Sequence, residues 1–101
     1  MINSIITGVG HYVPERVVTN FDLAKVMDTN DEWIQERTGI VERRHVETDS
    51  KVSSTDLGVI AAKNALKDAG ITAQDVAFIL FATLSPDYYF PGNGVLVQKE
   101  L

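Results

Sequence analysis

A tryptophan and an arginine four residues apart form the strongest candidate binding site in this sequence. The stretch DTNDEWIQERTGI contains Trp33, the only tryptophan of the chain, and Arg37 among several acidic residues. Residues at positions i and i+4 of a helix lie on the same face. An indole beside a guanidinium offers a flat stacking surface and a fixed cation, which suit an adenine ring and a phosphate. The alternative is an internal cation–π contact that covers the core, and spacing alone favours this structural role.

Other residues whose types could take part in binding or catalysis are better explained by structural roles. Gly8-Val9-Gly10 follows a strand-like segment, but the third glycine of a dinucleotide-binding loop is absent and Pro14 stands where its helix should begin. These glycines are therefore interpreted as turn glycines. His11 and His45 lack the spacing of metal ligands, and we expect no metal site. No serine is placed beside a basic partner in a pattern that indicates a nucleophile.

The chain contains no cysteine. This excludes a cysteine nucleophile, a thiolate zinc site and a disulfide, and it fits a reducing compartment. The net charge of -5 and the hydrophobic fraction of 45% are typical of a folded soluble protein and argue against a nucleic-acid partner. No apolar run approaches the roughly 20 residues that span a bilayer, and the first residues do not have the pattern of a secretory signal.

The helix that would carry the tryptophan has clear signals at both ends. Thr29 and Glu32 have the T-x-x-E spacing of a capping box, in which a hydroxyl and a carboxylate each accept from a backbone amide. Gly39 stands where a left-handed C-cap is expected. A helix is therefore predicted over residues 31–38.

Its neighbours in the sequence are short elements. Asn20 is expected to cap a helix over residues 21–27. The charge-rich residues 41–46 indicate an exposed strand, and residues 4–10 indicate a strand that ends in glycine.

The second half of the sequence reads as a strand between helices. Apolar residues at helical spacing predict a helix from a cap at residues 53–55 to about Ala69, closed by Gly70. The almost unbroken apolar run 76–84 is too short for a typical helix and predicts a strand buried on both faces, as in parallel sheets. A further helix is expected over residues 94–101. Because such a sheet needs more strands, we expect the chain to be part of a larger α/β protein.

Three sequence blocks follow one another along the chain: GVGHYVPERVVTN, TNDEWIQERTGI and ATLSPDYYFP. In this order they resemble the N-terminal part of β-ketoacyl-acyl carrier protein synthase III and its thiolase-superfamily relatives. The resemblance covers essentially all 101 residues. It implies an α/β chain belonging to the N-terminal part of a thiolase-like αβαβα fold, with a mixed sheet and covering helices. Residues 1–101 would be an incomplete N-terminal half-domain that is cut within a helix.

The resemblance also implies an activity. Members of the family are acyltransferases that condense an acyl-CoA with malonyl-acyl carrier protein and release carbon dioxide, which initiates fatty acid synthesis. They are expected to be cytoplasmic homodimers that use acyl-CoA as a substrate and need no cofactor. The Cys-His-Asn triad of the family has no match here, so the chain alone is expected to be inactive.

Five residues correspond to ligand-contacting positions of the family. The resemblance implies that Trp33 stacks on the CoA adenine, that Arg37 contacts the CoA phosphates and that Thr29 helps to line the same site. Phe90 would reach the acyl pocket across the dimer interface. Leu84 stands where well-known members have the second threonine of A-T-T-S. This difference leaves the acyl-chain preference open and leaves room for a relative in secondary metabolism.

Two other kinds of function remain open at this point. A CoA- or nucleotide-binding module without chemistry would explain the Trp33/Arg37 face and the missing nucleophile. An assembly fragment would use its apolar strand, with Phe78, Leu80 and Phe81 uncovered, to associate with itself.

Overall fold

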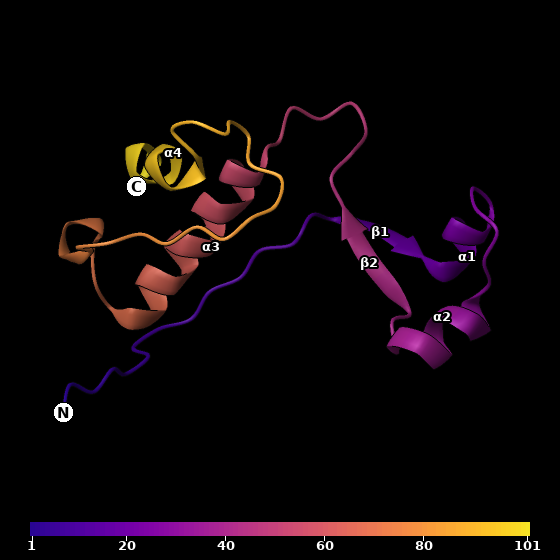
Figure 1. Ribbon diagram of the computed structural model, residues 1–101, viewed down its shortest axis with the longest axis horizontal. Coiled ribbons are helices and arrows are strands. Elements are labelled where there is room, and N and C mark those ends of the chain that lie inside the picture. Colours follow the sequence, from indigo (N-terminus) through magenta and orange to yellow (C-terminus); the bar gives the residue numbers. More distant parts are fainter. The chain divides into compact units, whose positions relative to one another are not determined.

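The computed structural model describes residues 1–101, which fold into two compact units. The first unit comprises Met1–Tyr12 and Lys51–Leu101, and the second comprises Val13–Ser50. Along the chain, the elements are β1 (Arg16–Thr19), α1 (Asn20–Ala24), α2 (Asp31–Thr38), β2 (Glu42–His45), α3 (Ser54–Ala69), the 3-10 helix η1 (Ala73–Asp75) and α4 (Asn93–Glu100). Figure 1 labels the α-helices and the strands.

The second unit is built on a hairpin-like pair of strands. β1 and β2 are antiparallel, with Arg16 opposite His45 and Thr19 opposite Glu42. The polypeptide between them forms α1 and α2, so both helices are inserted between paired strands. The predicted strand over 41–46 and the predicted helix over 31–38 are confirmed.

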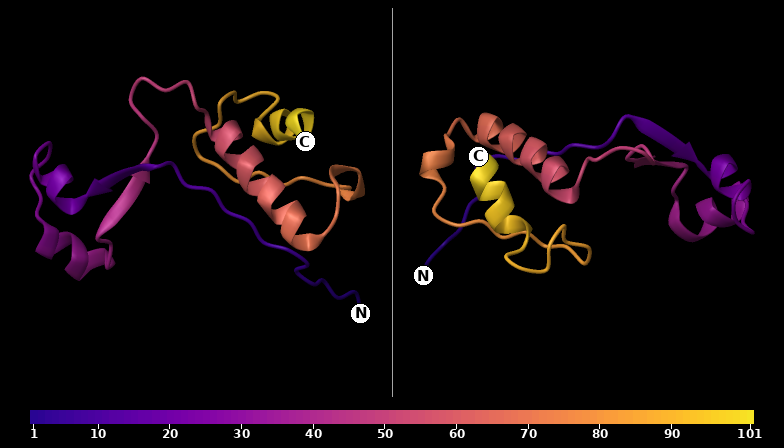
Figure 2. Two further views of the ribbon diagram at one scale, coloured as in Figure 1. Left: turned by 180° about the vertical axis from the view of Figure 1, so that it is seen from behind. Right: turned by 90° about the horizontal axis from the view of Figure 1, so that it is seen from above.

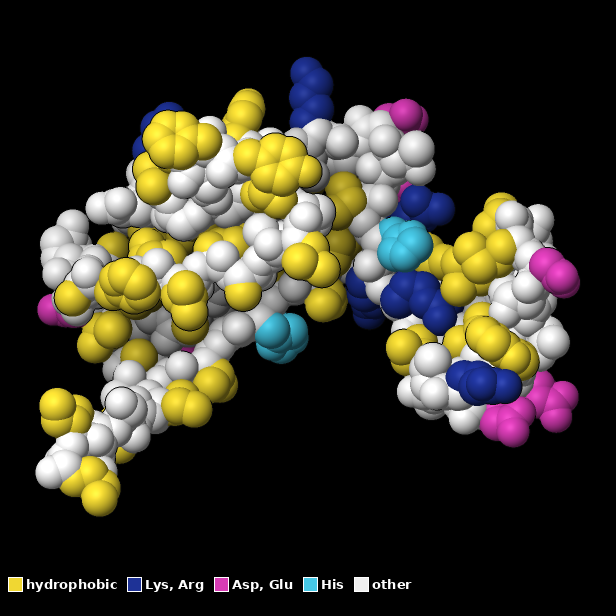
Figure 3. Space-filling model, in the orientation of Figure 1, with side chains coloured by type: hydrophobic (Ala, Val, Ile, Leu, Met, Phe, Trp, Pro, Cys, Tyr) yellow, Lys and Arg dark blue, Asp and Glu magenta, His cyan; other side chains and the backbone are white.

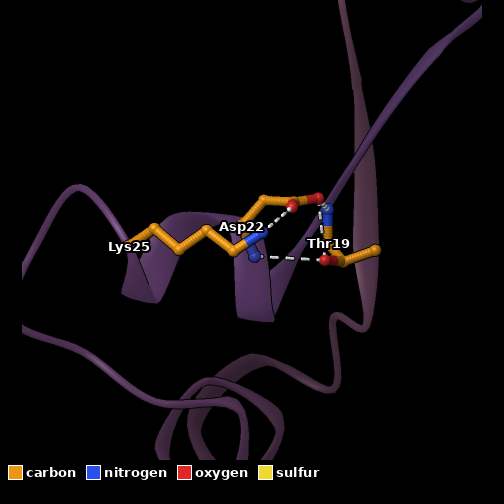
Figure 4. A network of polar contacts seen from close by, with 3 residues as sticks. All are labelled: Thr19, Asp22 and Lys25. Carbon is orange, nitrogen blue, oxygen red and sulfur yellow. Dashed lines mark hydrogen bonds and ion pairs between the residues drawn. The ribbon is translucent and has the colours of Figure 1, made fainter.

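The start of α1 differs from the prediction. Thr19, and not Asn20, is the N-cap: its hydroxyl accepts from the amide of Asp22, whose carboxylate accepts from the Thr19 amide and hydroxyl (Figure 4). This is a capping box with aspartate in the position of the usual glutamate. Asn20 becomes the first helical residue, and its side chain is buried. α1 also ends at Ala24 rather than near residue 27.

The pKa of the Asp22 carboxyl should depend on whether this capping box is formed. Hydrogen bonds from the backbone and side chain of Thr19, and a weaker contribution from Lys25, lower the pKa of Asp22 from 3.8 to about 2. A lowered pKa contributes stability above the unfolded value, and this stability is lost as the pH falls from about 4 through about 2. Thr19→Val removes the hydroxyl and keeps the backbone amide, so the pKa should rise part of the way to 3.8.

An NMR titration of the Asp22 carboxyl in the 101-residue chain measures this change. Lys25→Met is the control, because Lys25 and Asp22 form an exposed ion pair with 75% and 44% of their side chains accessible, and such pairs are weak. Lys25→Met is expected to raise the pKa of Asp22 by less than Thr19→Val does. An equal or larger shift in the control would contradict the assignment to the cap.

The first unit is organised around α3. Ser53 caps the helix through a capping box with Asp56, and Gly70 ends it in the left-handed conformation at φ 69°. The helix that the sequence predicts from about 53 to 69 is therefore confirmed. Residues 1–12 and 76–84 run along α3, and α4 lies near its N-terminal end (Figure 2).

Glycines allow the N-terminal segment to approach α3 closely. A Cβ built on Gly8 would lie 2.6 Å from the Ala69 Cβ, and one on Gly10 would lie 2.3 Å from the backbone nitrogen of Ala65. The amide of Val9, between them, donates to Asp68 at 2.9 Å. The Gly8-Val9-Gly10 stretch therefore packs against a helix, which replaces the turn interpretation.

Two predicted strands do not form β-ladders. Residues 4–10 and 76–84 are extended but have no strand beside them, because the only sheet is the β1–β2 pair. A single strand cannot satisfy its backbone groups without a neighbour. One side of the apolar run is also open: Phe78 and Leu80 are 80% and 84% exposed. Figure 3 shows hydrophobic side chains gathered over the surface of this unit.

Gly10→Ala should loosen the contact between the N-terminal segment and α3. The methyl group would meet backbone atoms of α3, which cannot rotate away, and overpacking of this kind costs about 1–3 kcal/mol. We expect a lower free energy of unfolding by chemical denaturation and faster hydrogen exchange at the Val9 amide.

Gly94→Ala is the matched control for this substitution. Gly94 is the second residue of α4, and its new Cβ would lie 3.9 Å from the Cβ of Phe81, which is an ordinary van der Waals contact. This variant should be neutral or stabilising. Equal losses in the two variants would contradict the close packing at Gly10.

Candidate nucleotide-binding face on helix α2

The N-cap of the helix that carries the candidate site lies one residue later than predicted. Asn30 is the N-cap of α2, and its Oδ1 accepts from the Trp33 amide at 2.8 Å. The predicted capping box of Thr29 and Glu32 is therefore wrong. Asparagine is the stronger N-cap residue, and two acids in the first turn, Asp31 and Glu32, favour this start electrostatically.

The C-terminal end of α2 and its one buried residue show which side of the helix faces solvent. Gly39 closes the helix in the left-handed conformation at φ 72°, as predicted. Ile34 is the buried residue of the helix, with 8% of its surface accessible. Trp33 precedes it and points elsewhere, with 52% of its surface accessible. The helix thus anchors itself through an isoleucine and presents its tryptophan to solvent.

Trp33 and Arg37 lie together, as their spacing predicts. The guanidinium carbon of Arg37 lies over the indole, 5.5 Å from the ring centroid. This is a cation–π contact, but it does not cover a core, because more than half of the tryptophan is exposed. The pair forms an open surface of one aromatic ring and one cation.

The positive charge of Arg37 is not neutralised within the chain. The one ion pair in the structure joins Lys25 and Asp22. Asp31, the first residue of the helix, is engaged elsewhere: it accepts from Gln35 at 2.7 Å and from Asn20 at 2.8 Å. These two hydrogen bonds, that of Gln35 foremost, lower the pKa of Asp31. The Arg37 guanidinium is therefore available to an external anion.

Thr29 immediately precedes the N-cap of this helix. Its hydroxyl oxygen is buried and has no hydrogen-bond partner. A buried hydroxyl without a partner costs about 1–3 kcal/mol, and this oxygen takes part in no hydrogen bond of the surrounding fold.

Leu84 and Phe90, the two predicted acyl-pocket residues, belong to the first unit. Both lie in the segment between η1 and α4, and their accessible fractions are 101% and 91%. Neither side chain contributes to the core of this unit.

The loop that carries Phe90 is held by a polar network that the sequence did not indicate. Asp87 accepts from the amides of Ser54 and Thr55 at 3.1 and 3.0 Å, and from the Ser54 hydroxyl at 2.7 Å. Asn93 accepts from the Asp87 amide and donates to the Ser54 hydroxyl. Partial burial raises the pKa of Asp87, but hydrogen bonds from Thr55 and Ser54 outweigh it and hold the pKa well below its usual range.

The structure contains no group of three histidine, cysteine or acidic side chains that could hold a metal ion. None of its helices combines the length and the apolar character needed to cross a membrane.

Comparison with known proteins identifies close relatives. No family model matches the chain. It is 53% identical over 96 residues to the β-ketoacyl-[acyl-carrier-protein] synthase III of Geobacillus kaustophilus, which covers 95% of the chain and 30% of the relative. It is 52% identical over 100 residues to the corresponding protein of Caulobacter vibrioides, covering 99% of the chain and 30% of the relative. The chain thus spans about 30% of the length of the curated relatives it matches.

Solved structures show the same relationship. The 3-oxoacyl-[acyl-carrier-protein] synthase III of Aquifex aeolicus is 44% identical, with a TM-score of 0.86 over 94% of this chain and 30% of that chain. The priming β-ketosynthase of the R1128 polyketide pathway is 33% identical, with a TM-score of 0.85 over 94% of this chain and 28% of that chain. The predicted resemblance and the predicted thiolase-like α/β fold are confirmed.

Proposed function

Because these 101 residues are homologous to a segment of the β-ketoacyl-acyl carrier protein synthase III enzymes, we propose that they supply the nucleotide-binding wall of such an enzyme. The observation that carries the proposal is the open pair of Trp33 and Arg37, 5.5 Å apart on one helix face. The indole stacks on the adenine of an acyl-CoA, and the guanidinium binds its phosphates. The hydroxyl of Thr29, buried without a partner, lines the same site.

The enzyme that contains this segment condenses an acyl-CoA with malonyl-acyl carrier protein, releases carbon dioxide and thereby initiates fatty acid synthesis. It works without a cofactor, as a cytoplasmic homodimer. The nucleotide is remote from the reacting thioester, so Trp33 and Arg37 hold the substrate equally before and during the reaction. Such uniform binding lowers KM and leaves kcat largely unchanged.

Two further residues, Phe90 and Leu84, concern the acyl end of the substrate. Phe90 contributes to the acyl pocket across the dimer interface, and Leu84 contributes to the pocket wall. Their exposure in the isolated chain, 91% for Phe90 and 101% for Leu84, leaves both side chains free to contact a partner surface.

Residues 1–101 form part of a larger half-domain in this proposal. The support is that relatives are covered over only about 30% of their length and that the extended residues 76–84 have no neighbouring strand. The nucleophile and its partners lie outside these residues, because the chain has no cysteine. The 101-residue chain alone is therefore expected to show no condensing activity.

A second candidate is a related condensing enzyme of secondary metabolism. The 33% identity to a polyketide priming β-ketosynthase supports it. Leu84 also supports it, because a leucine in the pocket wall changes the space and polarity available to the acyl group. Comparing acetyl-CoA with longer and branched acyl-CoA substrates separates the two candidates.

A chimera tests the proposal. The chain replaces the matching segment of the Caulobacter vibrioides relative, with which it shares 52% identity. The chimera is expected to fold and to condense an acyl-CoA with malonyl-acyl carrier protein. A folded chimera without acyl-CoA-dependent condensation would contradict the proposal. Micromolar binding of CoA by the 101-residue chain alone would instead favour a stand-alone binding module.

A further inference from the structure

We propose that Asn20 is a positioning residue that holds both ends of helix α2 and thereby sets the orientation of the Trp33–Arg37 face. The inference rests on the proposed function of that face in CoA binding. Asn20 itself contacts no ligand in this proposal, since its side chain is the one fully buried side chain of the structure.

Both the nitrogen and the oxygen of the Asn20 side-chain amide form hydrogen bonds. Its Nδ2 donates to Asp31 Oδ1 at 2.8 Å and to the carbonyl oxygen of Ile40 at 2.8 Å. Its Oδ1 accepts from Arg43 Nη2 at 2.7 Å. Both amide hydrogens are therefore directed at oxygen acceptors, and the oxygen is paired with a cation.

The two acceptors belong to the two ends of α2. Asp31 is the first residue of the helix, and Ile40 follows the C-cap Gly39. One NH₂ group thus joins the entry and the exit of the helix. The backbone amide of Asn20 adds a third bond, to the carbonyl of Val41 at 3.2 Å.

Helix α2 has few other anchors. It contains eight residues, and Ile34 is its only buried one. Helices of this length are unstable in isolation and depend on tertiary contacts. A single buried side chain leaves a helix free to rotate about that contact, whereas bonds at both ends prevent rotation. The hydrogen bonds of Asn20 therefore supply the orientation that Ile34 does not.

Arg43 connects this arrangement to the strands. Its Nη1 donates to the carbonyl of Val18 at 3.2 Å, while Nη2 reaches Asn20. Arg43 lies opposite Val18 in the β1–β2 register. The sheet thus fixes Arg43, Arg43 fixes the Asn20 oxygen, and the Asn20 nitrogen fixes α2.

Asn20→Asp tests the bonds to α2 separately from the bond to Arg43. The new carboxylate still accepts from Arg43, but it presents an acceptor to Asp31 and to the Ile40 carbonyl, which are acceptors themselves. The matched variant Arg43→Met has the opposite effect: it removes the cation and leaves the NH₂ group facing α2. Asp31→Ala is the second test variant, because it removes one of the two α2 contacts without placing a charge in the core.

The first readout is kinetic, in the chimeric enzyme described above. Asn20→Asp and Asp31→Ala should raise the KM for acyl-CoA by about ten- to a hundredfold. The KM for the matching acyl-pantetheine, which lacks the nucleotide, and the kcat should change much less. Arg43→Met should have a smaller effect on the ratio of the two KM values. An equal rise for both substrates, or an unchanged ratio in both α2 variants, would overturn the positioning role.

The second readout does not depend on CoA binding. In the 101-residue chain, Asn20→Asp and Asp31→Ala should accelerate hydrogen exchange of the α2 amides and change acrylamide quenching of Trp33. Unchanged exchange and quenching would overturn the inference even in an active enzyme. If Trp33→Ala leaves the KM for acyl-CoA unchanged, the proposed function fails, while exchange and quenching still decide whether Asn20 orients the helix.

Discussion

Trp33→Ala is expected to raise the KM for acyl-CoA by about 5- to 150-fold in an enzyme that carries this segment, with little change in kcat. Base–aromatic stacking contributes about 1–3 kcal/mol, which corresponds to this range. The indole is 52% exposed and contacts the Arg37 guanidinium, so its removal takes away a binding surface more than a core residue. The measurement is a comparison of steady-state constants between the wild-type enzyme and the variant.

Two controls make the Trp33 experiment specific. An acyl-pantetheine substrate lacks the adenine, so its KM should be nearly the same in both proteins. Trp33→Phe keeps an aromatic face and should lose only part of the affinity. Parallel losses for acyl-CoA and acyl-pantetheine would show that the variant damages the enzyme generally, and an unchanged KM for acyl-CoA would remove Trp33 from the site.

Arg37→Met is the second substitution with a large expected effect. It keeps a long flexible side chain but removes the cation that faces no carboxylate within the chain. Charge-assisted hydrogen bonds contribute about 1.5–3 kcal/mol when they are protected, and solvent screening reduces this value at an exposed helix face. We expect the KM for acyl-CoA to rise by about tenfold, and the KM for acyl-pantetheine to stay the same.

Ionic strength gives an independent measure of the same contact. Salt screens an exposed arginine–phosphate interaction, so the KM of the wild-type enzyme for acyl-CoA should rise with salt more steeply than that of Arg37→Met. Lys25→Met is the matched control, because it removes another exposed cation of the same unit that is paired with Asp22. Equal salt dependence in wild type and Arg37→Met would argue that the guanidinium does not meet the phosphates.

The helices could be predicted because their signals are local. Gly39 and Gly70 adopt the left-handed conformation at the ends of α2 and α3, where the sequence places them. The i and i+4 spacing of Trp33 and Arg37 gives their shared face directly. A helix contains its own hydrogen-bond partners, so such signals suffice.

The errors concern choices that depend on neighbours. At the start of each of two helices, the observed N-cap is the residue next to the predicted one. It is Thr19 and not Asn20 for α1, and Asn30 and not Thr29 for α2. The T-x-x-D spacing of Thr19 and Asp22 is the sequence signal that indicates the N-cap of α1. The strands over 4–10 and 76–84 lack ladders because a ladder needs residues from another part of a protein, which no local pattern supplies.

The long-range hydrogen bonds of Asn20 and Asp87 could also not be predicted from local patterns. Asn20 is hydrogen-bonded to positions 11, 20 and 23 residues away in the sequence. Asp87 reaches residues 32 and 33 positions away. Polar residues with such distant partners look like ordinary turn or capping residues until the fold brings the partners together.

The polar network around Asp87 has a consequence for the chemical ageing of the chain. Asn93 is followed by Gly94, and an asparagine before glycine is prone to deamidation. In this reaction the glycine nitrogen attacks the side-chain carbonyl carbon and the side-chain nitrogen leaves as ammonia, which gives a succinimide. Here the side-chain oxygen of Asn93 accepts from the Asp87 amide, and its side-chain nitrogen donates to the Ser54 hydroxyl. Asn93 and Gly94 are also the first two residues of α4. The attack requires the side chain to leave these partners and the helical turn to open. Deamidation at Asn93 is therefore slow while the network holds, and its rate records how often the start of α4 opens.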